Sequence, residues 1–116
     1  MPHFVFEYAR EIEQRGDITQ IMDALYDAGC ESGLMQPEDI KVRGLPVDFF
    51  RLRKSGESFI HVTISLLEGR SDQQKEALAV LAREKLSDLL PWVSSISLDV
   101  RDMNATAYKK RLLSDL

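Results

Sequence analysis

Pro2, the second residue of the chain, becomes a secondary amine at the N-terminus if the initiator Met1 is removed. An α-amino group has a reference pKa near about 8, well below that of a lysine. An apolar pocket or a nearby arginine lowers this pKa further, because both disfavour the ammonium form. Such an amine can act as a neutral general base at pH 7. If Met1 is retained, the Pro2 nitrogen belongs to an amide and cannot take up a proton.

A second chemical feature is Arg70, which lies in the segment Leu67-Glu68-Gly69-Arg70-Ser71-Asp72-Gln73-Gln74-Lys75-Glu76. The pattern predicts that a strand ends here and a helix begins, with Arg70 in the turn. A guanidinium is always charged and planar, and it can bind a carboxylate through two parallel hydrogen bonds. An arginine before a helix opposes the helix dipole, which favours a functional reason for its presence. A base such as Pro2 could move a proton along a conjugated acid while Arg70 stabilises the negative charge that develops.

These two segments resemble the tautomerase superfamily, whose hallmark is a free amino-terminal proline on a short strand. The Gly-Arg-Ser segment is similar to the part of 4-oxalocrotonate tautomerase that holds a catalytic arginine. The chain length and the Met-Pro-His-Phe start are more similar to the two-repeat 5-carboxymethyl-2-hydroxymuconate Δ-isomerase family. The resemblance covers residues 2 to about 108. It implies a cofactor-independent isomerase that moves a proton in an unsaturated 2-hydroxy or 2-oxo dicarboxylic acid, with Pro2 as general base and acid and Arg70 as the carboxylate-binding cation.

The resemblance also implies residues that bind the substrate. The family places a second cation on the strand after the first helix, where this chain has Lys41 and Arg43. Lys41 aligns with the arginine of the isomerase, and a lysine lacks the bidentate fork, so Arg43 could take that role instead. Tyr108 is the best match for the aromatic residue that closes the pocket. A second arginine of the short tautomerases aligns near Ser97, which is uncharged and argues against simple 4-oxalocrotonate chemistry.

The elements that would position these residues follow from periodicity. Alternating apolar residues predict strands, and in the first of them Phe4, Phe6 and Tyr8 share one face. Pro46 is expected to interrupt the second strand, which residues 49–53 could resume. The predicted strands span residues 4–8, 40–43, 58–67 and 95–101.

Two helices are predicted between these strands. Asp17 and Ser71 each read as an N-cap with a glutamine three residues later, and Gly33 reads as the C-cap of the first helix. Residues 105–116 are expected to form a short terminal helix.

The chain thus reads strand–helix–strand twice, in repeats of about residues 2–56 and 57–116, with Pro2 and Ile60 at corresponding strand starts. Each β-α-β unit should be right-handed with parallel outer strands. This pattern predicts a single α/β (α+β) domain with a four-stranded mixed sheet and both helices on one face. The other face is then uncovered and needs a partner. The resemblance implies a homotrimer.

Composition narrows the function further. The chain has 116 residues with 44% hydrophobic and 29% charged residues, and its net charge is −4. The absence of a basic run argues against nucleic-acid binding, and no segment is long and apolar enough to span a membrane. We expect no signal peptide before Pro2. The single cysteine, Cys30, fits a reducing cytoplasm, and the two histidines are too far apart in sequence from it to suggest a metal site.

Two alternatives stay open at this level. Lys41 and Ser97 are compatible with another activity of the superfamily, such as a phenylpyruvate tautomerase or a dehalogenase-like enzyme. The same scaffold could also serve as a non-catalytic trimeric interaction protein. His3 and His61 are expected to be structural.

Overall fold

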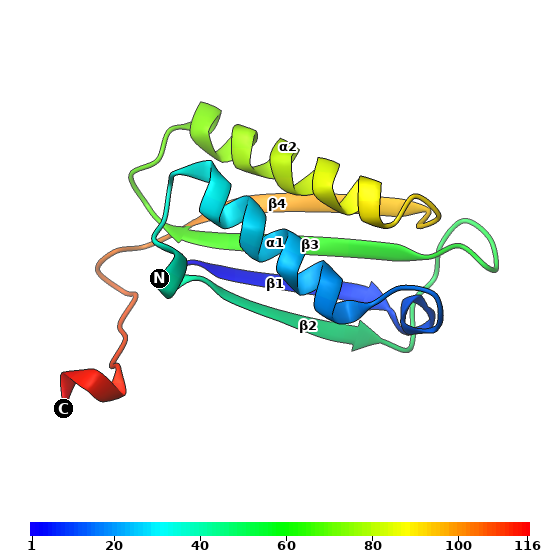
Figure 1. Ribbon diagram of the computed structural model, residues 1–116, viewed down its shortest axis with the longest axis horizontal. Coiled ribbons are helices and arrows are strands. Elements are labelled where there is room, and N and C mark those ends of the chain that lie inside the picture. The colour runs from blue at the N-terminus through cyan, green and yellow to red at the C-terminus, as the bar shows by residue number, and fades with distance from the viewer.

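A computed structural model describes residues 1–116 as one four-stranded sheet with two long helices on one of its faces (Figure 1). The strand order is β2-β1-β3-β4. β1 (His3–Ala9) pairs parallel to β2 (Lys41–Val47) and antiparallel to β3 (Phe59–Leu67), which pairs parallel to β4 (Ser95–Met103). The predicted mixed sheet with its two β-α-β units is confirmed. No helix is long and apolar enough to cross a membrane.

Side-chain bonds fix where the helices begin. At the start of α1 (Ile18–Ser32) the Asp17 carboxylate accepts hydrogen bonds from the backbone N–H groups of Thr19 and Gln20, and Gly33 ends the helix at φ 72°. At the start of α2 (Asp72–Leu89) Ser71 and Gln74 form a complete capping box. These contacts satisfy N–H groups that a helix leaves without partners. The predicted caps are therefore confirmed, and Arg70 is held directly before the α2 cap.

The core lies between the sheet and the helices. Alternate residues of β1 and β3 are buried there, including Phe4 and Phe6 with 0% exposure, and the two helices contribute Leu25 and Leu86, also at 0%. Seventeen buried apolar residues form this single cluster. The opposite face of the sheet carries no helix. It presents polar side chains, among them His3, Glu7, Lys41, Arg43, His61 and Ser97.

Two predictions about elements are wrong. Pro46 does not interrupt the second strand, because β2 continues to Val47 and residues 49–53 belong to no strand. β2 is an edge strand, where a missing N–H removes no ladder bond. Residues 105–116 do not form a helix beyond the short 3-10 turn η3 (Leu113–Asp115). Two further 3-10 turns, η1 (Arg10–Gln14) and η2 (Pro37–Asp39), lie after β1 and before β2.

The same backbone hydrogen bond occurs once in each repeat and shows which residues of the two repeats correspond. The Pro2 carbonyl accepts a hydrogen bond from the Lys41 N–H at 3.1 Å, and the Ser58 carbonyl accepts one from the Ser95 N–H at 3.1 Å. Ser58, and not Ile60, is therefore the counterpart of Pro2. The alternation over β3 gave the right face but not the residue at which the second parallel pair begins.

Candidate active site

Pro2 lies directly before β1 and is buried. Because β1 and β3 are antiparallel, with His3 opposite Ser65, the start of β1 lies beside the end of β3. The turn from β3 into α2 therefore brings Arg70 to the same end of the sheet as Pro2. Pro2 and Arg70 are far apart in the sequence, and the pairing of β1 with β3 brings them together.

A cavity of about 400 Å³ occupies this end of the molecule. Both Pro2 and Arg70 line it, together with residues 33–36 after α1 and residues 66–67 at the end of β3. Met1, Asp39 and Lys110 complete the wall. The structure thus brings together the two residues that the sequence singled out for catalysis, although their catalytic roles stay predictions.

Arg70 is fixed in the cavity wall by the backbone. Its guanidinium donates one hydrogen bond to the Leu67 carbonyl at 3.1 Å and a second to the Leu34 carbonyl at 2.6 Å. Arg70 takes part in none of the ion pairs of the structure. A guanidinium has five N–H donors, so donors remain for a carboxylate. A surface salt bridge therefore does not account for the position of Arg70.

The cavity also changes the acidity of an amine placed in it. Burial lowers the pKa of the Met1 amino group below 8.0, and the positive charges of Lys110 and Arg70 lower it further, while Asp39 raises it. Desolvation and like charge both disfavour an ammonium. The environment at the start of the chain therefore favours a neutral amine, which is the form a general base needs.

The three residues predicted to bind substrate lie elsewhere. Lys41 and Arg43 alternate onto the uncovered face of β2, and Tyr108 follows β4; none of the three lines the cavity. Arg43 and Tyr108 meet instead at His3, where Arg43 Nη1 lies 3.2 Å from Nδ1 and the Tyr108 hydroxyl lies 2.9 Å from Nε2. The predicted site is thus divided between the cavity and a neighbouring cluster around His3.

The contacts of His3 define its protonation. Arginine can only donate, so the His3 Nδ1 accepts from Arg43 and the ring is neutral, with its proton on Nε2. Nε2 then donates to the Tyr108 hydroxyl. Burial lowers the pKa of His3 below 6.5, and the charges of Arg43 and Lys41 lower it further. His3 is therefore a bridge between a strand cation and the C-terminal segment, a role that no sequence pattern indicated.

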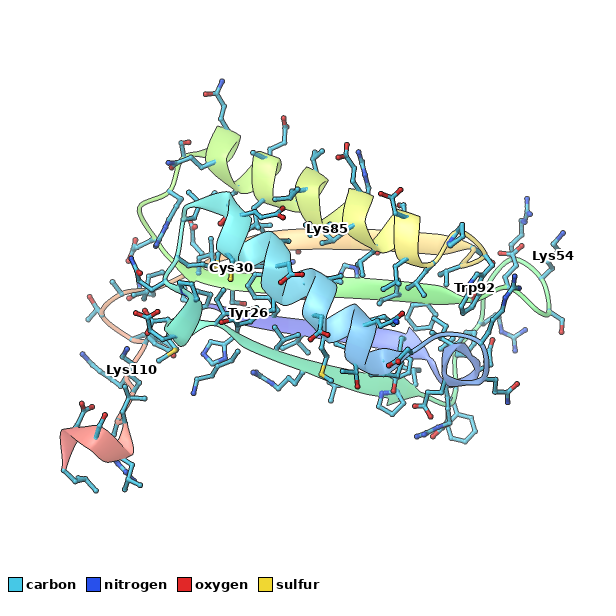
Figure 2. All side chains as sticks on the ribbon, viewed as in Figure 1. Tyr26, Cys30, Lys54, Lys85, Trp92 and Lys110 are labelled. Carbon is cyan, nitrogen blue, oxygen red and sulfur yellow. The ribbon has the colours of Figure 1, made fainter.

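Lys110 and Asp39 are the charged cavity side chains that the sequence did not indicate. Lys110 lies in a segment without periodicity, so only the path of the chain after β4 could have shown where it goes. Figure 2 shows it at the end of the molecule where the chain begins. No group of three or more His, Cys, Asp or Glu side chains is arranged to hold a metal ion.

The model of the 5-carboxymethyl-2-hydroxymuconate isomerase family matches residues 2–113 of the chain. The chain belongs to this family. The predicted membership of the tautomerase superfamily is confirmed, and the chain is an isomerase of that superfamily. No curated protein matches the chain in a sequence search.

Solved structures share the fold at low identity. A 5-carboxymethyl-2-hydroxymuconate isomerase from Deinococcus radiodurans R1 superposes with a TM-score of 0.82 and 18% identity, covering 95% of this chain and 88% of that one. A 5-carboxymethyl-2-hydroxymuconate delta-isomerase gives a TM-score of 0.79 at 19% identity, covering 97% and 88%. A fused 4-OT symmetric trimer gives 0.77 at 18% identity, covering 93% and 90%.

Proposed function

We propose that this isomerase converts 5-carboxymethyl-2-hydroxymuconate or a closely related unsaturated 2-hydroxy acid to its 2-oxo isomer, with Pro2 as the base after removal of Met1. The observation that carries the proposal is the shared cavity of Pro2 and Arg70. Family membership supplies the class of substrate. Substrates of this class carry carboxylates at both ends of a conjugated chain, and Arg70 offers its free N–H groups to one of them.

The proposed reaction needs only a proton transfer. The neutral amine of Pro2 removes the proton of the 2-hydroxyl group, and the conjugated double bonds shift along the chain. The protonated amine then returns a proton to a carbon, which leaves a 2-oxo group and restores the base. Arg70 stabilises the negative charge on the conjugated oxygens between the two steps. No oxidant, reductant or hydrolytic water enters this balance.

We also propose a homotrimer, located in the cytoplasm, in which the uncovered sheet faces meet. The support is the helix-free face of the sheet and the trimeric assembly of the fused 4-OT. In such an assembly Lys41 and Arg43 could contact substrate in the cavity of a neighbouring subunit. Light scattering on a size-exclusion column measures the mass and would overturn this point if it found a monomer.

The function is tested with protein carrying a C-terminal tag, so that Met1 can be removed. Intact mass establishes whether Pro2 is the first residue, and ultraviolet spectroscopy follows ketonisation of 2-hydroxymuconate acids. The expected result is activity in the processed protein and its loss in Pro2→Ala. The matched control is the same chain with an N-terminal tag, in which the Pro2 nitrogen is an amide and activity should be lost with the fold unchanged.

A substrate panel separates the alternatives. Turnover of enol-phenylpyruvate alone would indicate a phenylpyruvate tautomerase, and halide release from a chlorinated acrylate would indicate dehalogenase-like chemistry. Processed protein that is inert on every acid would refute the proposed reaction and favour a non-catalytic interaction protein.

A further inference from the structure

The C-terminal segment after β4 is turned back toward the start of the chain by specific contacts. Met103 accepts a hydrogen bond from the Glu68 N–H at 3.1 Å, and the Glu68 carboxylate accepts one from the Ala105 N–H at 2.8 Å. The Asn104 side chain then accepts from the N–H groups of Thr106 and Ala107, at 2.9 and 3.0 Å. These bonds close a turn, so the direction of the following residues is defined.

Tyr108 holds the C-terminal segment in place through a contact with His3. Its hydroxyl lies 2.9 Å from His3 Nε2, and the two rings meet edge to face with their centroids 5.8 Å apart. His3 follows Pro2 directly, so this contact holds the C-terminal segment beside the cavity. Two residues later, Lys110 reaches the cavity wall, while Lys109 does not line it.

Lys110 has no charged partner within the chain. It takes part in none of the seven ion pairs and in no side-chain hydrogen bond, although Asp39 lines the same cavity. Arg70 and Lys110 give the cavity two cations against one carboxylate. A second cation would stabilise a substrate with more than one carboxylate, and within one chain Lys110 lines this cavity whereas Lys41 and Arg43 do not.

We propose that Lys110, positioned by the contact of Tyr108 with His3, binds the second carboxylate of the substrate in the Pro2 cavity, opposite the carboxylate bound by Arg70. This inference rests on the proposed function for the identity of the substrate. The ligand class that the two cations in one cavity indicate is wider: an acyclic dicarboxylate that places its two ends on Arg70 and Lys110. A lysine suits the second position, because its long stem adapts to the length of the ligand.

Direct binding tests the assignment without turnover. Calorimetry with adipate, a saturated dicarboxylate, and hexanoate, the matched monocarboxylate, compares wild type with Lys110→Met and Lys110→Arg. Lys110→Met should raise the Kd for adipate about tenfold, as expected for one lost charged contact, and should leave that for hexanoate within about twofold. Lys110→Arg should restore most of the adipate affinity, and the matched control Lys109→Met should resemble wild type.

Tyr108→Phe examines the positioning role. It should weaken adipate binding severalfold in the wild-type background and have little further effect in the Lys110→Met background, because residues that act together are not additive. A merely structural loss would weaken binding equally in both backgrounds. Additive effects of the two substitutions would overturn the positioning role of Tyr108.

The outcomes separate this inference from the proposed function. Adipate binding that is absent in wild type, or unchanged in Lys110→Met, overturns the assignment of Lys110 even if the enzyme isomerises its substrate. Equal weakening of adipate and hexanoate also overturns it, because the effect would then not concern the second carboxylate. Protein that binds adipate through Lys110 but does not isomerise any 2-hydroxy acid supports the assignment and refutes the proposed reaction.

Discussion

Replacing Arg70 with alanine should reduce both stability and activity, by amounts that can be separated. The substitution removes two charge-assisted hydrogen bonds, to the carbonyls of Leu34 and Leu67. Bonds of this kind contribute about 1.5–3 kcal/mol each. Because Leu34 and Leu67 line an open cavity where water can reach the freed carbonyls, we expect the lower end for the two bonds together, a loss of about 3 kcal/mol in the free energy of unfolding.

This loss leaves most of the protein folded. Domains of this size have free energies of unfolding of about 5–15 kcal/mol, so the variant stays predominantly native at 25 °C. Loss of a cation that stabilises developing negative charge lowers kcat by about 100–1,000-fold. A fall of that size cannot come from unfolding and would therefore report the chemical role of Arg70.

Urea unfolding at a fixed protein concentration measures the first quantity, and steady-state kinetics measure the second. Arg83→Ala is the matched control, since Arg83 is an exposed arginine on α2 that forms no ion pair; it should change the free energy of unfolding by less than about 0.5 kcal/mol. Wild-type stability in Arg70→Ala would refute the structural role of its two bonds. Lost stability with unchanged kcat/KM would refute its role in the reaction.

Three further predictions concern the framework of the site. In Gly44→Ala the new Cβ would lie 2.6 Å from Cε2 of the fully buried Phe6 ring, so the free energy of unfolding should fall by about 1–3 kcal/mol. Adding Phe6→Leu to Gly44→Ala should recover part of this loss. If urea unfolding showed that the losses of the two substitutions simply add, the clash would be contradicted. Burial and the charge of Arg43 lower the pKa of His3, so its NMR titration should have a midpoint below 6.5. Between the folded pKa of His3 and pH 6.5, the unfolded state binds more protons than the folded state. The contribution of the neutral His3 ring to stability is therefore complete above pH 6.5 and is lost as the pH falls through the folded pKa. Arg43→Met should raise the His3 midpoint only partly toward 6.5, because burial is the largest cause, and a wild-type midpoint at or above 6.5 would refute the assignment of a neutral ring. Ser71→Ala removes the α2 capping box and should lower the free energy of unfolding by about 1 kcal/mol, which lowers the midpoint of thermal unfolding. An unchanged midpoint would mean that water replaces the cap.

Signals that are local in sequence predicted the framework well. The alternation through Phe4 and Phe6 identified a buried strand face, and Asp17 and Ser71 identified the starts of both helices. Each of these signals depends on residues within a few positions of one another. Pro46 was misread because its effect depends on whether its strand lies at the edge or the centre of the sheet, which is a property of the whole topology.

The candidate site also contains residues that local sequence signals identify and residues whose position depends on the tertiary fold. Pro2 and Arg70 could be paired because of their residue types and because their segments resemble the tautomerase superfamily. Lys110 could not be found, because its position depends on a turn at Asn104 and on the contact of Tyr108 with His3, both of which follow from the tertiary fold. A loop residue without a periodic pattern leaves no such mark in the sequence.

The correspondence between Pro2 and Ser58 has a consequence for how many reactions one chain can carry out at once. At the far end of the sheet, Ser58 stands where Pro2 stands at the near end, and its nitrogen is a peptide N–H that bonds to the Ser94 hydroxyl at 3.0 Å. Gly16 precedes the α1 cap as Arg70 precedes the α2 cap, and a Cβ there would lie 3.3 Å from both Leu90 and Trp92. After removal of Met1, the duplicated framework would therefore carry an N-terminal amine at only one of its two corresponding strand starts. With Pro2 as the base, we therefore expect each chain to have one reaction site for its two repeats.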